Sequence, residues 1–116
     1  MEIARREGSA VAGLPVADTL RRANEIGEAV EELDREGLWS AQTPQAFRRE
    51  VLVRAREAAA GRDYTDDAAA VAAAGVKVRM VPGERRNLKI TTIEDLSYAR
   101  ELVAHGAAAI SATGAP

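Results

Sequence analysis

Lys89 is the residue whose type and setting most suggest chemistry. The sequence has only two lysines against 14 arginines, and Lys89 stands between Leu88 and Ile90, where a predicted strand meets a predicted helix. In doubly wound α/β folds, ligands lie at the carboxyl ends of strands. A lysine ammonium there binds phosphate as a compact point charge. The alternative is a lysine whose stem lies along a strand edge while its charge stays in water.

Four further positions carry groups that bind oxygen-rich anions. Pro44 restricts the backbone of Thr43, which favours a hydroxyl presented to a phosphate or sugar oxygen, although a turn residue that bonds its own backbone fits equally. Thr65 precedes a predicted helix. Its hydroxyl either binds an anion at the helix N-terminus or is an ordinary N-cap. Arg35 offers a bidentate fork to phosphate or is a solvated charge. Thr19 is a polar contact or part of a capped turn.

Composition excludes several classes of protein. With no Cys and one His, the chain cannot build disulfides, zinc clusters or thiol nucleophiles. We assign no metal to Asp66 and Asp67, because adjacent carboxylates point in different directions on a helix and complement its dipole. A net charge of −2 argues against a nucleic-acid partner. The sequence has no long apolar run or signal peptide, which predicts no membrane partner and a cytoplasmic location.

The order of predicted elements indicates an α/β domain. Gly27 and Gly37 bracket an acidic stretch that is either a helix or one strand of a projecting hairpin. Its few apolar residues cannot form a core, so it must lie on a neighbouring surface or partner. The other segments are strands over 9–16, 38–47, 76–81 and 87–91, helices over 48–60 and 68–74, a helix opening at 92–95, and a disordered tail over 106–116.

Five motifs occur in one order along the chain, and together they resemble a known family. They are LPVADTLRR (14–22), DREGLW (34–39), QTPQAF (42–47), TDDA (65–68) and NLKITTIEDL (87–96). This series resembles the C-terminal half of the 2-C-methyl-D-erythritol 4-phosphate cytidylyltransferases over about residues 8–104. The resemblance implies one partial domain over 1–116, the C-terminal half of a Rossmann-like nucleotidyltransferase sheet with a projecting dimerisation arm at about 20–38.

The resemblance also implies a reaction and a role for each candidate residue. In this family, 2-C-methyl-D-erythritol 4-phosphate attacks the α-phosphate of CTP, which releases pyrophosphate and gives 4-diphosphocytidyl-2-C-methyl-D-erythritol for isoprenoid precursor synthesis. Lys89 matches the catalytic lysine at the reacting phosphates. Thr19 and Arg35 match groups that reach the sugar phosphate from the neighbouring subunit of a homodimer. Thr43 and Thr65 match hydroxyl-bearing residues on the opposite wall.

Two family features are absent from the sequence. The family's glycine-rich basic loop, which holds the CTP triphosphate, and its Asp-Ala-Ala-Arg-like segment, which holds Mg²⁺, have no counterpart between Met1 and Pro116. We therefore expect no cofactor or metal ligand in this chain, and no activity from it alone. Two alternatives stay open: a ribitol- or other polyol-phosphate cytidylyltransferase, although DREGLW favours the methylerythritol family, and a non-catalytic dimerisation module.

Overall fold

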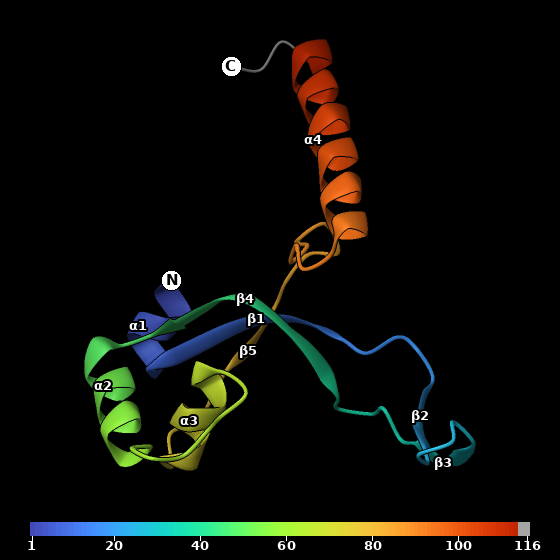
Figure 1. The fold of residues 1–116 in the computed structure, drawn as a ribbon. Helices are drawn as coiled ribbons and strands as arrows, with labels where there is room; N and C mark the ends of the chain where they lie inside the picture. Colours follow the sequence, from blue (N-terminus) through green and yellow to red (C-terminus); the bar gives the residue numbers. More distant parts are fainter. Residues whose placement is uncertain (114–116) are drawn as a thin grey trace. The chain divides into compact units, whose positions relative to one another are not determined.

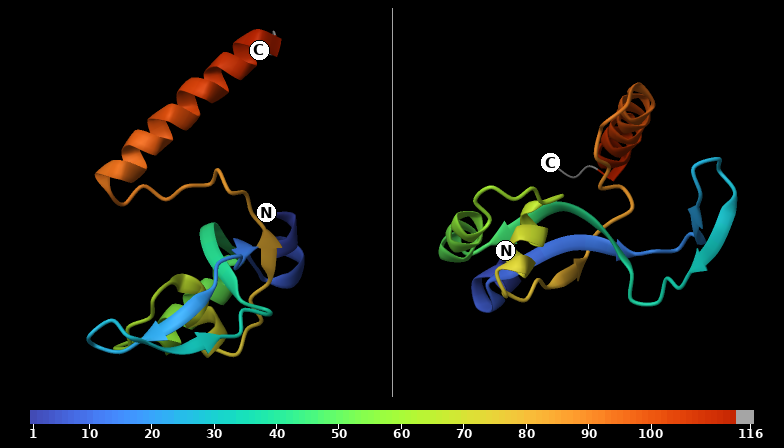
Figure 2. Two further views of the ribbon diagram at one scale, coloured as in Figure 1. Left: turned by 90° about the vertical axis from the view of Figure 1, so that its right-hand side faces the viewer. Right: turned by 60° about the horizontal axis from the view of Figure 1, so that its bottom comes forward.

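The structure is a computed structural model that describes residues 1–113, with side chains as far as Gly106. It divides into two compact units, the first over Met1–Gly83 and the second from Glu84 onward. In the first unit the elements follow one another along the chain (Figures 1 and 2). They are α1 (Glu2–Glu7), β1 (Ser9–Pro15), β2 (Leu20–Ala23), β3 (Ala29–Leu33), β4 (Trp39–Phe47), α2 (Arg49–Ala58), α3 (Asp67–Ala73) and β5 (Met80–Pro82).

Three of these strands form a mixed sheet in the order β4-β1-β5. The central strand β1 pairs antiparallel with β4 and parallel with β5. Its residues are small, and Gly13 shows why: a Cβ on Gly13 would lie 2.8 Å from the carbonyl oxygen of Ser40 and 2.8 Å from Cε of Met80. The predicted strands at 9–16 and 38–47 are confirmed, whereas the strand expected over 76–81 is regular only at Met80–Pro82.

Helices α2 and α3 supply the core of the first unit. Val51 and Ala55 on α2 are buried against Val71 on α3, and Phe47, Leu52, Val76 and Val78 pack around them. The helices predicted over 48–60 and 68–74 are therefore confirmed, with ends that differ by one or two residues. Because alanine supplies much of the apolar composition, the buried side chains are few and small.

The segment between β1 and β4 is a β-hairpin, which settles the alternative that the sequence left open. Strands β2 and β3 pair antiparallel, with Arg21 opposite Glu32 and Arg22 opposite Glu31. The turn forms because the Asn24 carboxamide oxygen accepts hydrogen bonds from two backbone N–H groups and Gly27 adopts a φ of 83°. The cross-strand ion pairs are exposed and contribute little, so the hairpin depends on contacts outside its own two strands for stability.

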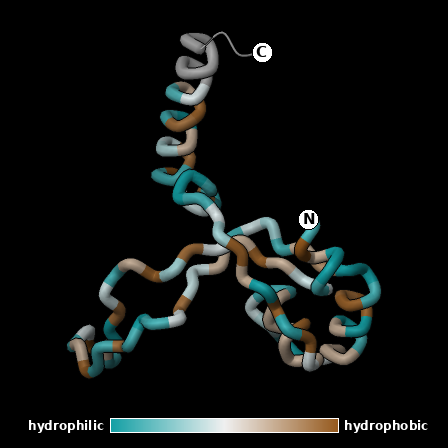
Figure 3. Tube along the Cα trace, turned by 180° about the vertical axis from the view of Figure 1, so that it is seen from behind, coloured by the Kyte–Doolittle hydropathy of each residue, from teal (hydrophilic) through white to brown (hydrophobic). Residues whose placement is uncertain are grey.

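The second unit contains a turn, an extended segment and the helix α4 (Ile93–Thr113). The hydroxyl of Thr92 accepts a hydrogen bond from the Asp95 N–H at 3.1 Å, which is in line with the helix predicted to open at 92–95. Apolar and hydrophilic residues are interspersed along the coloured first turns of α4 (Figure 3). Ile93 is 78% exposed and Val103 is 71% exposed. The buried core residues of the described part lie in the first unit, so these apolar side chains of α4 are uncovered.

One expectation for this unit is wrong. The strand expected over 87–91 is not formed. A β-strand requires a hydrogen-bonded neighbouring strand, and the β-propensity of these residues does not provide that neighbour. The helix continues to Thr113, beyond Gly106, since the alanines that follow favour helix. Residues 114–116 of the expected tail lie outside the described part. In residues 1–113, no helix is long and apolar enough to cross a membrane.

Candidate functional site

Thr19 and Arg35 lie together at the base of the hairpin. They line a depression of about 450 Å³ with Glu32, Leu33 and Asp34. Thr19 immediately precedes β2, and Arg35 follows β3 by two residues, so the antiparallel pairing of Leu20 with Leu33 brings them to the same end of the hairpin. The structure therefore places a hydroxyl, a guanidinium and carboxylates around one opening.

The side chain of Arg35 is held in place by the loop that precedes β2. Its Nη1 donates a hydrogen bond to the carbonyl oxygen of Ala17 on the opposite strand connection. A tight turn follows, in which the Leu38 N–H donates to the Arg35 carbonyl oxygen at 3.0 Å and Gly37 adopts a φ of 74°. Because a guanidinium has five N–H donors, the contact with Ala17 orients the group and leaves donors for an anion.

Thr43 and Thr65 are exposed residues on two neighbouring segments, strand β4 and the loop before α3. The first turn of α3 is joined to β4 by Gln45, whose Nε2 donates to Oδ2 of Asp66 at 2.8 Å. Asp66, and not Thr65, is the N-cap of α3: its Oδ1 accepts from the Ala69 N–H at 2.8 Å. The ordinary N-cap role considered for Thr65 is therefore wrong.

The hairpin and α3 lie at opposite ends of the first unit (Figure 1). The strands β1 and β4 run from the end covered by α2 and α3 to the end from which β2 and β3 extend. The pair formed by Thr19 and Arg35 is thus separated from Thr65 along the length of the sheet.

Lys89 belongs to the second unit, in the extended segment before α4. Its neighbour Ile90 is 52% exposed, and the chain enters the segment through a turn in which the Asn87 N–H donates to the Glu84 carbonyl oxygen at 3.0 Å. Beyond Lys89, the Asp95 carboxylate accepts hydrogen bonds from the backbone of Thr91 and Thr92 and from the Thr91 hydroxyl. These bonds hold the pKa of Asp95 below its usual range.

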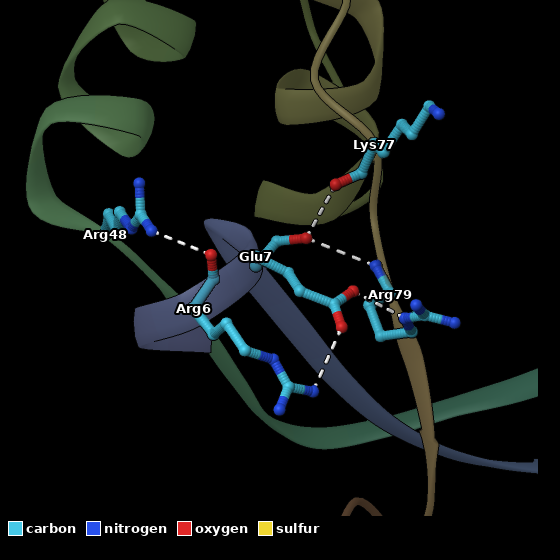
Figure 4. A network of polar contacts seen from close by, with 6 residues as sticks. Arg6, Glu7, Arg48, Lys77 and Arg79 are labelled. Atoms are coloured by element: carbon cyan, nitrogen blue, oxygen red, sulfur yellow. Dashed lines mark hydrogen bonds and ion pairs between the residues drawn. The ribbon is translucent and has the colours of Figure 1, made fainter. Parts of the chain in front are cut away.

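A second depression, of about 870 Å³, has a basic lining that the sequence did not single out. Lys77, Arg79 and Trp39 line it with Glu7, Val78 and Met80. Arg79 Nε donates to Glu7 at 2.6 Å, and Figure 4 shows Glu7 between Arg6 and Arg79. The Arg79 contact, with a smaller contribution from Arg6, holds the pKa of the Glu7 carboxyl below its ordinary range. This ion pair ties α1 to the segment that leads into β5.

Within the described residues, no group of three or more His, Asp or Glu side chains gathers that could hold a metal ion. Asp66 is engaged as the helix cap, and Asp67 pairs with Arg56 across α2 and α3. The described residues therefore present no cluster of carboxylates for a metal ion, whereas Thr19 and Arg35 offer hydrogen bonds to an anion and to hydroxyl groups.

The chain matches the family described as IspD, 2-C-methyl-D-erythritol 4-phosphate cytidylyltransferase, over residues 1–105. It is 50% identical over 101 residues to the protein of that description from Deinococcus radiodurans, a match that covers 84% of this chain and 43% of the relative. It is 48% identical over 105 residues to the one from Chromobacterium violaceum, which covers 88% and 47%. The chain therefore spans about half the length of the curated relatives.

The fold is similar to a solved structure of the same description. The crystal structure of 2-C-methyl-D-erythritol 4-phosphate cytidylyltransferase from Thermus thermophilus matches with a TM-score of 0.80 and 38% identity. The match covers 88% of this chain and 51% of that one. The α/β fold expected from the sequence is thus found in solved relatives over part of their chain.

Proposed function

Since this chain belongs to the 2-C-methyl-D-erythritol 4-phosphate cytidylyltransferase family, we propose that it is the C-terminal, sugar-phosphate-binding and dimerisation half of such an enzyme. The enzyme transfers a cytidylyl group from CTP to 2-C-methyl-D-erythritol 4-phosphate. An oxygen of the sugar phosphate forms a bond to the α-phosphorus of CTP as the bond from that phosphorus to the pyrophosphate oxygen breaks. The products are 4-diphosphocytidyl-2-C-methyl-D-erythritol and pyrophosphate.

The observation that carries the proposal is the depression shared by Thr19 and Arg35. A guanidinium binds a phosphate through two parallel hydrogen bonds. The carboxylates of Glu32 and Asp34 in the same lining accept hydrogen bonds from hydroxyl groups, which a polyol supplies in number. A polyol monophosphate satisfies both kinds of group, whereas a simple anion would leave the carboxylates facing its charge.

Thr43, Thr65 and Lys89 are proposed as further ligands of the sugar phosphate, because they match positions in the family's motifs. The two hydroxyls bind oxygens of the sugar phosphate, and the Lys89 ammonium neutralises charge that accumulates on the phosphates as the new bond forms. Fixed cations of this kind are a large contribution to phosphoryl and nucleotidyl transfer, because they align two polyanions that otherwise repel.

The position of the hairpin supports a pocket built from two subunits. Thr19 and Arg35 lie at the end of the unit opposite α3 (Figure 2), so a hairpin that reaches a second copy would bring them to the surface of that copy. The hairpin also exposes apolar side chains that a partner would cover: Ile26 is 78% exposed and Val30 is 60% exposed. A twofold homodimer then contains two such pockets.

Mixing two defective chains tests the shared pocket. Arg35→Ala and Lys89→Ala chains are unfolded together, refolded as a mixture and titrated with 2-C-methyl-D-erythritol 4-phosphate by calorimetry. If each pocket takes Arg35 from one chain and Lys89 from the other, about a quarter of the pockets in a random mixture are intact. The unmixed variants should bind weakly, and Arg62→Ala, which removes an exposed arginine just after α2, should bind as the unaltered chain does.

Two results would contradict the proposal. An unaltered chain that does not bind the sugar phosphate would exclude the binding role altogether. Binding that is lost in both variants but not regained in the mixture would exclude a site that takes Arg35 from one chain and Lys89 from the other. Titration with ribitol 5-phosphate in place of the methylerythritol compound decides between the two sugar-phosphate classes.

We expect no cytidylyl transfer from the 116-residue chain by itself, because its sequence contains no glycine-rich basic loop to hold the CTP triphosphate. The Mg²⁺ that the family uses would likewise be held by residues other than those of this chain. A pyrophosphate-release assay with CTP, Mg²⁺ and the sugar phosphate measures this directly. Release above the background of a Lys89→Ala chain would show that the chain holds the nucleotide after all.

A further inference from the structure

Gln45 joins strand β4 to the start of α3 through both ends of its side-chain amide. Its Nε2 donates to Oδ2 of Asp66 at 2.8 Å, and its Oε1 accepts from the Ala68 N–H at 3.3 Å. Both bonds are partly buried. Oδ1 of Asp66 accepts from the Ala69 N–H. Gln45 therefore joins β4 both to the N-cap residue of α3 and to the backbone of its first turn.

The residues next to this connection are the two threonines of the proposed pocket. Thr43 lies two positions before Gln45 on β4, and Thr65 immediately precedes Asp66. Both threonines are exposed, so core packing does not hold their side chains. The connection between β4 and α3 therefore sets the spacing between the segments that carry the two hydroxyls, together with the packing of Phe47 at the end of β4 against the core of α2 and α3.

From these contacts we propose that Gln45 is a positioning residue, which fixes the loop bearing Thr65 against the strand bearing Thr43 so that both hydroxyls meet one sugar phosphate. The inference rests on the proposed function, because it assumes that these threonines bind the sugar phosphate. Its physical basis is that a pocket lined by two hydroxyls loses affinity when either one moves by about 1 Å.

The chemistry of the connection is directional, which gives a sharp test. Gln45→Glu puts a second carboxylate against Asp66, and Asp66→Asn turns an amide NH₂ toward the NH₂ of Gln45. In the double variant Gln45→Glu with Asp66→Asn, the amide of residue 66 donates to the carboxylate of residue 45. The exchange restores the bond between residues 45 and 66 with donor and acceptor reversed. The other carboxylate oxygen of residue 45 still accepts from the Ala68 N–H, so that bond keeps its direction.

The experiment measures the dissociation constant for 2-C-methyl-D-erythritol 4-phosphate in the 116-residue chain, at a temperature well below the melting temperature of every variant. We expect each single variant to bind about tenfold more weakly and the double variant to return to within about threefold of the unaltered chain. Arg56→Gln is the matched control: it removes the contact of Arg56 with Asp67 in the same turn without touching β4, and should leave affinity unchanged.

The outcomes separate this inference from the proposed function. If the unaltered chain binds but the single variants bind equally well, or the double variant binds no better than they do, Gln45 does not position the pocket and the proposed function stands. If the unaltered chain does not bind, the proposed function fails and the positioning role fails with it. Should a single variant not fold, Gln45→Met, which lacks both bonds and adds no charge, takes its place under the same criteria.

Discussion

Ser9 gives the most quantitative prediction for stability. It is fully buried at the start of β1, where its hydroxyl donates to the Lys77 carbonyl oxygen at 2.7 Å and accepts from the Arg79 N–H at 3.1 Å. The next ladder bond, from the Val11 N–H to the Arg79 carbonyl oxygen at 2.8 Å, is made by the backbone. The serine hydroxyl therefore extends the pairing of β1 beyond the three regular residues of β5.

Ser9→Ala should lower the free energy of unfolding by about 2 kcal/mol, since each lost hydrogen bond is worth about 1 kcal/mol net and the freed groups need new partners. Small domains have total stabilities of only about 5–15 kcal/mol, and the core here is small. The expected fall in melting temperature is therefore about 8–16 °C. Urea unfolding followed by the fluorescence of Trp39, the single tryptophan, measures the change.

Ser40→Ala is the control, because Ser40 is exposed on β4 and surface substitutions usually change stability by less than about 0.5 kcal/mol. A Ser9→Ala chain that unfolds at the same urea concentration as Ser40→Ala would refute the reasoning. A changed slope of the urea transition in Ser9→Ala would instead report a change in the surface exposed on unfolding.

Three other predictions concern the scaffold around the site. Gly13→Ala should destabilise β1 by at least about 1 kcal/mol, because the new methyl group would meet the Ser40 carbonyl oxygen at 2.8 Å; an unchanged melting temperature would contradict this. Glu7→Gln should make stability less sensitive to acid. The Arg79 contact lowers the pKa of Glu7, so the charged carboxylate stabilises the fold above the ordinary glutamate pKa of about 4.3. This contribution is lost as pH falls toward the folded-state pKa. Melting temperatures between about pH 7 and about pH 3 should thus fall less steeply in Glu7→Gln than in the unaltered chain. Asp95→Ala removes the acceptor of three hydrogen bonds before α4 and should reduce the helical circular dichroism signal, whereas equal signals would show that α4 begins without this cap.

Local sequence patterns predicted the elements whose stability is local. The helices α2 and α3 and the start of α4 depend on patterns within a few residues, so the sequence alone indicated them. The strand expected over 87–91 failed for the complementary reason: β structure depends on a neighbour, and the spacing of Leu88 and Ile90 does not tell whether one exists.

The acidic segment between Gly27 and Gly37 illustrates the same limit. Its composition suited a helix and a hairpin equally, and the choice depended on the pairing of Arg21 and Arg22 with Glu32 and Glu31. These contacts join the segment to residues that precede it. A hydrophobic or charge pattern within the segment alone therefore cannot predict them.

For the candidate site, the sequence determined which groups are present and, through the order of its motifs, the family to which they belong. Only the tertiary structure brought Thr19 beside Arg35 and connected Gln45 to Asp66, since strand pairing and helix docking decide which distant residues meet. It also showed that Asp66 caps α3 in place of Thr65. The sequence alone does not distinguish two adjacent residues that can both act as N-cap, because the choice depends on the backbone angles where the helix begins.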